Sequence, residues 1–152
     1  MSVNVKASQE YLKNAVMTAT NEQLQLMLYD GAARFATQGM EAIRRSDFEG
    51  SHEALTRAQK IVVALHDGLR REVNPQLVDE MGALYAFVFR RLVDANMNRD
   101  VQAAEDALKI LRHLRQTWVL LMDKVASERA KSSPAPTDTP TSDKPAAFSV
   151  EC

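Results

Sequence analysis

The sequence predicts an all-α protein, an antiparallel up-down four-helix bundle with a short N-terminal helical segment and a disordered C-terminal tail. In four long segments, apolar residues recur at spacings of three and four positions, which is typical of helices with one buried face. Polar residues that can cap helices separate these segments, and the connections are short. Because short connections make consecutive helices antiparallel, the four segments should form one bundle over residues 20–130.

The N-terminal segment, residues 1–19, is mostly polar. A small apolar set within it follows the spacing i, i+1, i+4 and i+5, and so shares one helical face. Its members are Tyr11, Leu12, Ala15 and Val16. A helix this short is marginal in water by itself. We therefore expect it to be ordered only when that face docks on the bundle or on a partner.

The first long helix should begin at Asn21, because Thr20 and Gln23 have the spacing of a capping box, and it should end near Arg45. It carries two apolar stripes that lie more than about 100° apart around the helix axis. The first stripe, expected in the core, is Leu24, Leu28, Gly31, Phe35, Gly39 and Ala42. The second is Leu26, Tyr29, Ala33, Ala36, Met40 and Ile43. The second stripe either makes this the central, most buried helix or binds a partner.

One glycine, Gly31, lies in the middle of the first long helix. Glycine at such a position is about 1 kcal/mol less favourable than alanine. We therefore expect a close approach of another backbone at this point, from a neighbouring helix or from a bound peptide.

Three further helices follow. The second is expected from the polar break at 46–51 to about Arg71, with the seam Leu55, Ala58, Val62, Leu65 and Leu69. The third should run from about Pro75 to Met97 with Asn74 as its cap, and should bury Leu77, Met81, Leu84, Val88, Leu92 and Ala95. It also carries Tyr85, Phe87 and Phe89, more aromatic surface than one seam can hold. The fourth, capped by Asn98 or Asp100, has the seam Ala107, Leu111, Leu114, Trp118, Leu121 and Val125.

Residues 131–152 are expected to be disordered, since four of the five prolines lie there among serine, threonine, alanine and aspartate. The single cysteine of the chain is Cys152. One cysteine excludes disulfides within the chain and a metal site built from several cysteines.

Composition and motifs argue against several classes of function. The formal net charge is −1 and the basic residues are dispersed, so nucleic acid and an anionic membrane are poor ligands. No apolar run reaches the roughly 18 residues that span a bilayer, and no signal peptide is recognised, which favours the cytoplasm. The histidines are scattered, and only Glu49 and His52 have a di-iron spacing. Because phosphate loops and nucleophile motifs are also missing, we expect no catalytic residue, no metal and no cofactor.

Two blocks of sequence carry a more specific signal. The first comprises 15–19 (Ala-Val-Met-Thr-Ala), 22–24 (Glu-Gln-Leu) and 26–32 (Leu-Met-Leu-Tyr-Asp-Gly-Ala). The second comprises Leu84-Tyr85, Arg90-Arg91-Leu92, Ala95-Asn96 and Arg99-Asp100, followed by Trp118 in the last helix. Together they resemble the signatures of the flagellar secretion chaperones of the FliS family, over about residues 11–124. The chain departs from the family at 20–21, where Ser-Pro is usual, and at 73–75, where a Gly-rich turn with an acidic residue is common.

This resemblance implies a non-enzymatic chaperone that acts in the cytoplasm. Its client would be the C-terminal segment of flagellin, which it would keep from polymerising before the complex reaches the type III export gate. The client would lie as an amphipathic segment in an apolar groove. The side chains expected to contact it are Leu26, Tyr29, Ala33, Met40, Ile43, Tyr85 and Phe89, with Tyr11, Leu12 and Val16 forming a lid over part of the groove in the free protein.

Two other functions fit parts of the pattern. The two-striped first helix alone would also suit a helical adaptor or regulatory protein that binds another amphipathic helix. A metal-dependent bundle enzyme rests only on Glu49 and His52, which lie on either side of Gly50.

Overall fold

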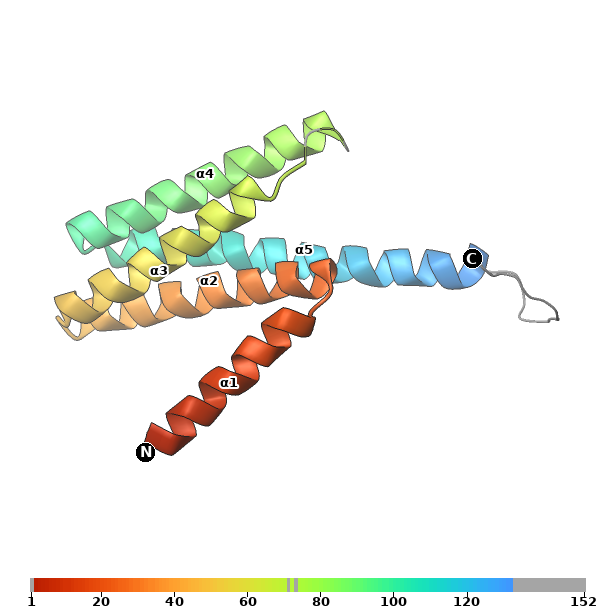
Figure 1. Ribbon diagram of the computed structural model, residues 1–152. Helices are drawn as coiled ribbons and strands as arrows, with labels where there is room; N and C mark the ends of the chain where they lie inside the picture. The colour runs from red at the N-terminus through yellow and green to blue at the C-terminus, as the bar shows by residue number, and fades with distance from the viewer. Residues whose placement is uncertain (1, 71, 73, 133–152) are drawn as a thin grey trace. The chain divides into compact units, whose positions relative to one another are not determined.

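The computed structural model describes residues 2–70, 72 and 74–132 (Figure 1). These described residues contain five helices and no strand, so the predicted all-α class is confirmed. The helices are α1 (Ser2–Thr18), α2 (Asn21–Arg44), α3 (Phe48–Asp67), α4 (Pro75–Asn98) and α5 (Val101–Ser132). The chain divides into two compact units, Met1–Trp118 and Val119–Cys152, and α5 contributes to both. Most of the expected tail, including Cys152, lies outside the described residues.

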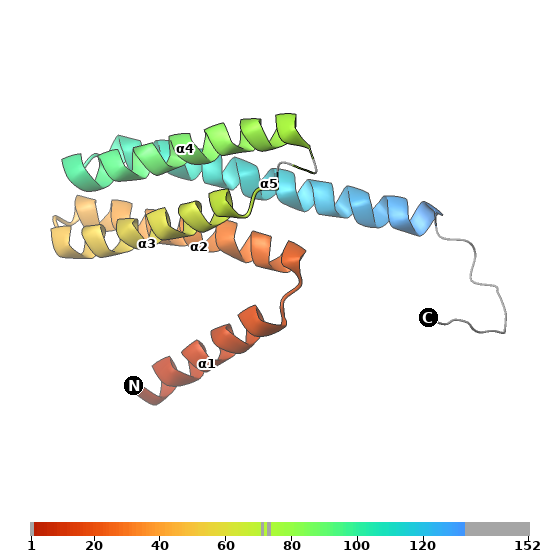
Figure 2. The same cartoon turned by 45° about the horizontal axis from the view of Figure 1, so that its top comes forward.

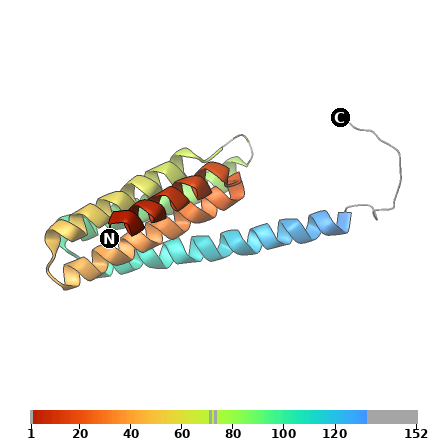
Figure 3. The ribbon, with the colours of Figure 1, turned by 60° about the horizontal axis from the view of Figure 1, so that its bottom comes forward.

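Four helices build the bundle in the first unit. α3 lies beside α2 in three views (Figure 1, Figure 2, Figure 3) and beside α4 in two of them (Figure 1, Figure 2), and α5 up to Trp118 completes the same hydrophobic core. Residues 45–47 connect α2 to α3, and residues 99–100 connect α4 to α5. Such short connections require each helix to run antiparallel to the one before it. The first unit therefore contains the predicted up-down four-helix bundle.

Side-chain caps define the helix starts. At α2 the predicted capping box is present, since the Gln23 N–H donates to the Thr20 hydroxyl over 3.1 Å and the Thr20 N–H donates to the Gln23 side-chain oxygen over 3.0 Å. At α4 the Asn74 side chain accepts from the Leu77 N–H at 3.2 Å, as expected of its cap. The cap of α5 is Asp100, one of the two predicted candidates. Each such cap typically contributes about 1 kcal/mol to helix stability.

Both predicted boundaries of α3 are wrong by a few residues. α3 begins at Phe48, inside the predicted polar break, because the Asp47 carboxylate accepts from the Gly50 N–H at 3.0 Å and starts the helix there. α3 ends at Asp67, earlier than the expected end near residue 71. α5 continues to Ser132.

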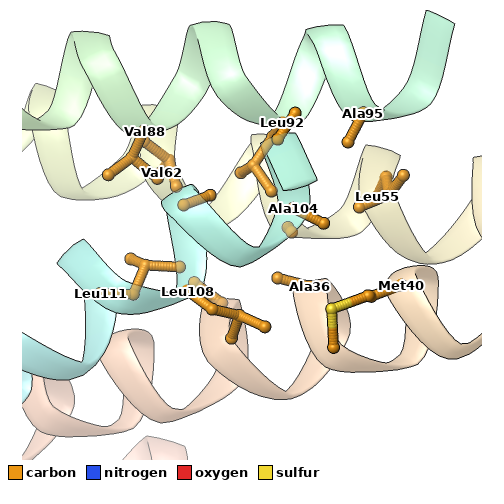
Figure 4. Close-up of a cluster of buried hydrophobic side chains, with 14 of the residues drawn as sticks. Ala36, Met40, Leu55, Val62, Val88, Leu92, Ala95, Ala104, Leu108 and Leu111 are labelled. Carbon is orange, nitrogen blue, oxygen red and sulfur yellow. The ribbon is translucent and has the colours of Figure 1, made fainter. Parts of the chain in front are cut away.

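Buried apolar residues of all four bundle helices supply the core (Figure 4). From the predicted seams it includes Leu55, Ala58, Val62, Leu65, Val88, Leu92, Ala95, Ala107, Leu111 and Leu114. Two seam residues are exposed instead, Leu77 at 49% and Leu121 at 45%. Leu77 lies in the first turn of α4, and Leu121 lies beyond Trp118, where the first unit ends. The periodic pattern thus continues past the stretch of helix that the core covers.

α2 is buried on both of its apolar stripes. Its buried residues are Tyr29, Gly31, Ala32, Ala36, Gly39, Met40, Ala42 and Ile43, more than any other described helix contributes. They include members of both predicted stripes, whereas Leu24 and Leu28 of the first stripe remain partly exposed. Most of the second stripe is therefore part of the core, and only Leu26 and Ala33 of that stripe remain partly exposed.

Gly31 and Gly39 let side chains of α3 approach α2 closely. A Cβ at Gly31 would lie 3.2 Å from Cδ1 of Ile61, and a Cβ at Gly39 would lie 2.6 Å from Cγ of Leu55. The close contact expected at Gly31 therefore exists. The expectation that a backbone makes it is wrong, because the neighbouring atom belongs to a side chain.

Gly39→Ala should destabilise the bundle, because the added methyl would overlap the fully buried Leu55. Overpacking of this kind costs about 1–3 kcal/mol, which outweighs the roughly 1 kcal/mol that alanine gains over glycine in a helix. Gly82→Ala is the control, because its Cβ would meet its nearest neighbours at 3.7 Å. Urea denaturation should show a lower free energy of unfolding for Gly39→Ala only. Equal stability of the two variants would contradict this packing.

Candidate binding site

α3 and α4 form an apolar groove on the bundle. Val62, Val63 and His66 of α3 and Tyr85, Ala86, Phe89 and Arg90 of α4 line it, and its volume is about 260 Å³. Larger hollows elsewhere are lined mainly by charged and polar side chains, including Asp47, Glu49 and Lys60 in one of them. Because ligand sites are mostly apolar with a few placed polar groups, the α3–α4 groove is the better candidate.

A buried hydrogen-bonded network lies at the base of the groove. The hydroxyls of Tyr29 and Tyr85 are 2.6 Å apart, and the Gln25 amide donates to the Tyr29 hydroxyl over 3.1 Å and to the Tyr85 hydroxyl over 3.3 Å. The two rings are tilted by 40° with centroids 6.5 Å apart. This network satisfies both phenols inside the core, as buried tyrosines require. It joins α2 to α4 directly beneath the groove.

The environment of Tyr85 disfavours its ionised form. Burial is the largest cause, followed by the hydrogen bond with Tyr29, and together they hold the pKa of Tyr85 well above its usual range. Tyr85 therefore stays neutral and keeps its hydroxyl proton for hydrogen bonding. The groove wall above it is more accessible, since Val63 is 44% exposed.

The structure brings only two of the predicted client-binding residues to this groove, Tyr85 and Phe89. Tyr29, Met40 and Ile43 belong to the buried core and offer no surface to a client in this state. They were expected on a stripe that contacts the client, but α2 packs these three side chains inside the bundle. Leu26 and Ala33 are half-buried on α2.

The expected lid on α1 is not formed. Tyr11, Leu12 and Val16 are all exposed, Tyr11 by 77%, instead of packing against another element. The lid was expected over a groove lined by α2 and α4, but Tyr29, Met40 and Ile43 on the α2 side are buried in the core of the bundle. α1 thus presents an apolar face that has no partner among the described residues.

Sequence reasoning missed five residues that line the groove, namely Val62, Val63, His66, Ala86 and Arg90. Val63 and His66 each follow a seam residue of α3 directly. A position next to a seam residue could have indicated a groove-lining side chain. Which side of the seam remains accessible, however, depends on where α4 packs.

The described part of the chain offers no support for a metal site or for a membrane-spanning helix. His52 Nδ1 lies 3.2 Å from the side-chain oxygen of Asn96 on α4. No group of three histidine, cysteine, aspartate or glutamate side chains there could hold a metal ion. No helix in the described ranges has the length and apolar character needed to cross a membrane.

A helical bundle with an apolar surface groove is an arrangement that proteins use to bind a helical segment of another chain. The chain belongs to the FliS family of flagellar secretion chaperones, because the family model described as flagellar protein FliS matches residues 4–125. The resemblance found in the sequence is thereby confirmed.

Relatives and a solved structure agree with this family. The chain is 37% identical over 108 residues to the flagellar secretion chaperone FliS of Bacillus subtilis, covering 71% of this chain and 80% of that relative. It is 29% identical over 125 residues to the flagellar secretion chaperone FliS of Salmonella typhimurium, covering 82% and 93%. A crystal structure of a flagellar chaperone from bacteria has a similar fold, with a TM-score of 0.65 at 17% identity over 80% of this chain and 98% of that one.

Tyr85→Phe should make the free energy of unfolding fall less steeply as the pH rises above neutral. Because the pKa of Tyr85 is raised in the folded state, its contribution is present below the unfolded tyrosine pKa of about 10 and is lost as the pH rises above that value. Urea denaturation between pH 8 and pH 11 should show a decline in the free energy of unfolding that is up to about 1.4 kcal/mol per pH unit less steep in the variant. Tyr11→Phe, at an exposed position, should decline like wild type. Identical slopes for all three proteins would contradict the assignment.

Proposed function

We propose that this chain binds the C-terminal segment of flagellin in the cytoplasm and keeps it from polymerising until the complex reaches the type III flagellar export gate. Membership of the FliS family, over residues 4–125, is the observation that carries the proposal. The apolar groove between α3 and α4 supplies a physical means of binding, and two of its residues, Tyr85 and Phe89, were expected at the site from sequence.

The client would bind as an amphipathic helix with its apolar side chains in the groove. Val63 and Phe89 would contact these side chains, while the buried Tyr85 supports the groove from below. An unfolded client must become ordered on binding, which opposes association, so a large contact surface is needed for useful affinity. This mode of binding needs no cofactor and no catalytic residue.

The exposed apolar face of α1 provides additional contact surface for the same client. Tyr11, Leu12 and Val16 were expected at the site, and their exposure leaves them available. A specific, stable interface buries about 1,200–2,000 Å² in total, and contact with α1 would add to the apolar area that the client buries. We therefore include the three α1 residues, with Leu26 and Ala33, among the proposed contacts.

The client assignment is tested by co-expression with flagellin of the same organism and gel filtration of the complex. We expect a one-to-one complex that is lost when the C-terminal segment of flagellin is removed. Removal of an N-terminal flagellin segment of equal length is the control and should leave the complex intact. A complex that survives the C-terminal truncation would refute the proposed client.

Val63→Gln should weaken flagellin binding about tenfold, because an unpaired amide would be buried against the apolar face of the client. Val63 is 44% exposed, so thermal melting of the free protein should change little. Met97→Gln is a matched control at a 77% exposed apolar position outside the groove and should bind like wild type. Isothermal titration calorimetry gives both affinities, and equal affinities would place the client elsewhere on the bundle.

A further inference from the structure

Arg90 is a cation on the wall of the apolar groove. It follows Phe89 on α4, and Ala86 lines the groove one turn earlier on the same helix. No ion pair or hydrogen bond joins the Arg90 guanidinium to any other residue that the structure describes. Its charge is therefore available to a ligand in the groove.

The neighbouring arginine has a structural role instead. Nε and Nη2 of Arg91 donate to Asp106 over 3.2 and 2.9 Å, and Nη1 donates to Asp94 over 3.1 Å. The bonds to Asp106 join α4 to α5, and the bond to Asp94 lies within α4. Both use donors of Arg91 within the bundle. Because successive residues of a helix point about 100° apart, Arg90 lines the groove while Arg91 reaches these carboxylates.

The described residues that line the groove include no carboxylate. Apart from Arg90, the polar groups there are the Tyr85 hydroxyl and the His66 imidazole. Nδ1 of His66 lies 3.9 Å from Oδ1 of Asp67, whose side chain is exposed and does not line the groove. An apolar surface with a cation and no acidic wall residue favours an acidic occupant over a basic one.

We propose that Arg90 makes the groove selective for an amphipathic helix that carries an aspartate or glutamate beside its apolar face. The inference rests on the proposed function, since this helix is taken to belong to the client. The carboxylate would lie about one helical turn from an apolar side chain that contacts Phe89, because residues three or four positions apart share a helix face. Arg90 can hold it through two parallel N–H donors. A lysine at the position of this carboxylate would be disfavoured, because its positive charge would repel Arg90.

Charge reversal at Arg90 tests this selectivity. The full chain and its Arg90→Glu variant are titrated with two synthetic amphipathic helices that share one apolar face and carry either glutamate or lysine at the flanking positions. The wild type should bind the glutamate helix about tenfold more tightly, and Arg90→Glu should reverse the order. Both differences should shrink in high salt, because exposed charges are screened.

Arg112→Glu is the matched control for this charge change. Arg112 is exposed on α5, lies outside the α3–α4 groove and has no ion pair with another described residue. It should keep the preference of the wild type for the glutamate helix. Equal loss of preference in the two variants, or no preference in the wild type, would overturn the proposal. Circular dichroism verifies that each variant is folded.

Binding measurements with the flagellin C-terminal segment distinguish failure of this inference from failure of the proposed function. If the wild type does not bind the segment but distinguishes the two synthetic helices through Arg90, the proposed client is wrong and the charge selectivity stands. If it binds the segment, and neither Arg90→Glu nor replacement of the segment's carboxylates by amides changes the affinity more than about twofold, the selectivity is wrong and the client stands.

Discussion

The hydrogen bond between the hydroxyls of Tyr29 and Tyr85 is the contact on which the arrangement of α2 and α4 depends. These two tyrosines are the largest fully buried side chains in the described structure. A buried hydroxyl without a partner would be unfavourable by about 1–3 kcal/mol, so the helices must be placed where the two hydroxyls and the Gln25 amide meet. The same contact holds Tyr85 beneath the α3–α4 groove. Packing of the core and the shape of the candidate site are therefore linked.

α4 combines structural and proposed binding roles through its helical periodicity. Val88 and Leu92 enter the core, Arg91 reaches the carboxylates of Asp94 and Asp106, and Phe89 and Arg90 line the groove. Neighbouring residues take different roles because each step along a helix turns the side chain by about 100°. The surplus of aromatic residues in α4 follows from this arrangement, since the helix contributes to a core and to a surface groove.

α1 differs physically from the bundle helices. Its described side chains include none that is buried, whereas every bundle helix contributes buried residues to the core. Burial of an exposed apolar face by a partner lowers the free energy of the system. For this reason we include α1 in the proposed client surface. The proposal thus combines a groove supported by the core with a helix that has no partner in the described structure.

Local chemistry in the sequence was sufficient to predict the helices and the family. Helix caps and seams depend on residues a few positions apart, so they could be found from spacing alone. Examples are the cap of Thr20 and Gln23, the Asn74 cap and the α3 seam from Leu55 to Leu65. Tertiary packing decided which surfaces stay open. The angular pattern of α2 defined two apolar stripes, but it contains no information on how many helices surround α2. Only the position of the neighbouring helices buries Tyr29, exposes Leu77 and leaves a groove between Val63 and Phe89.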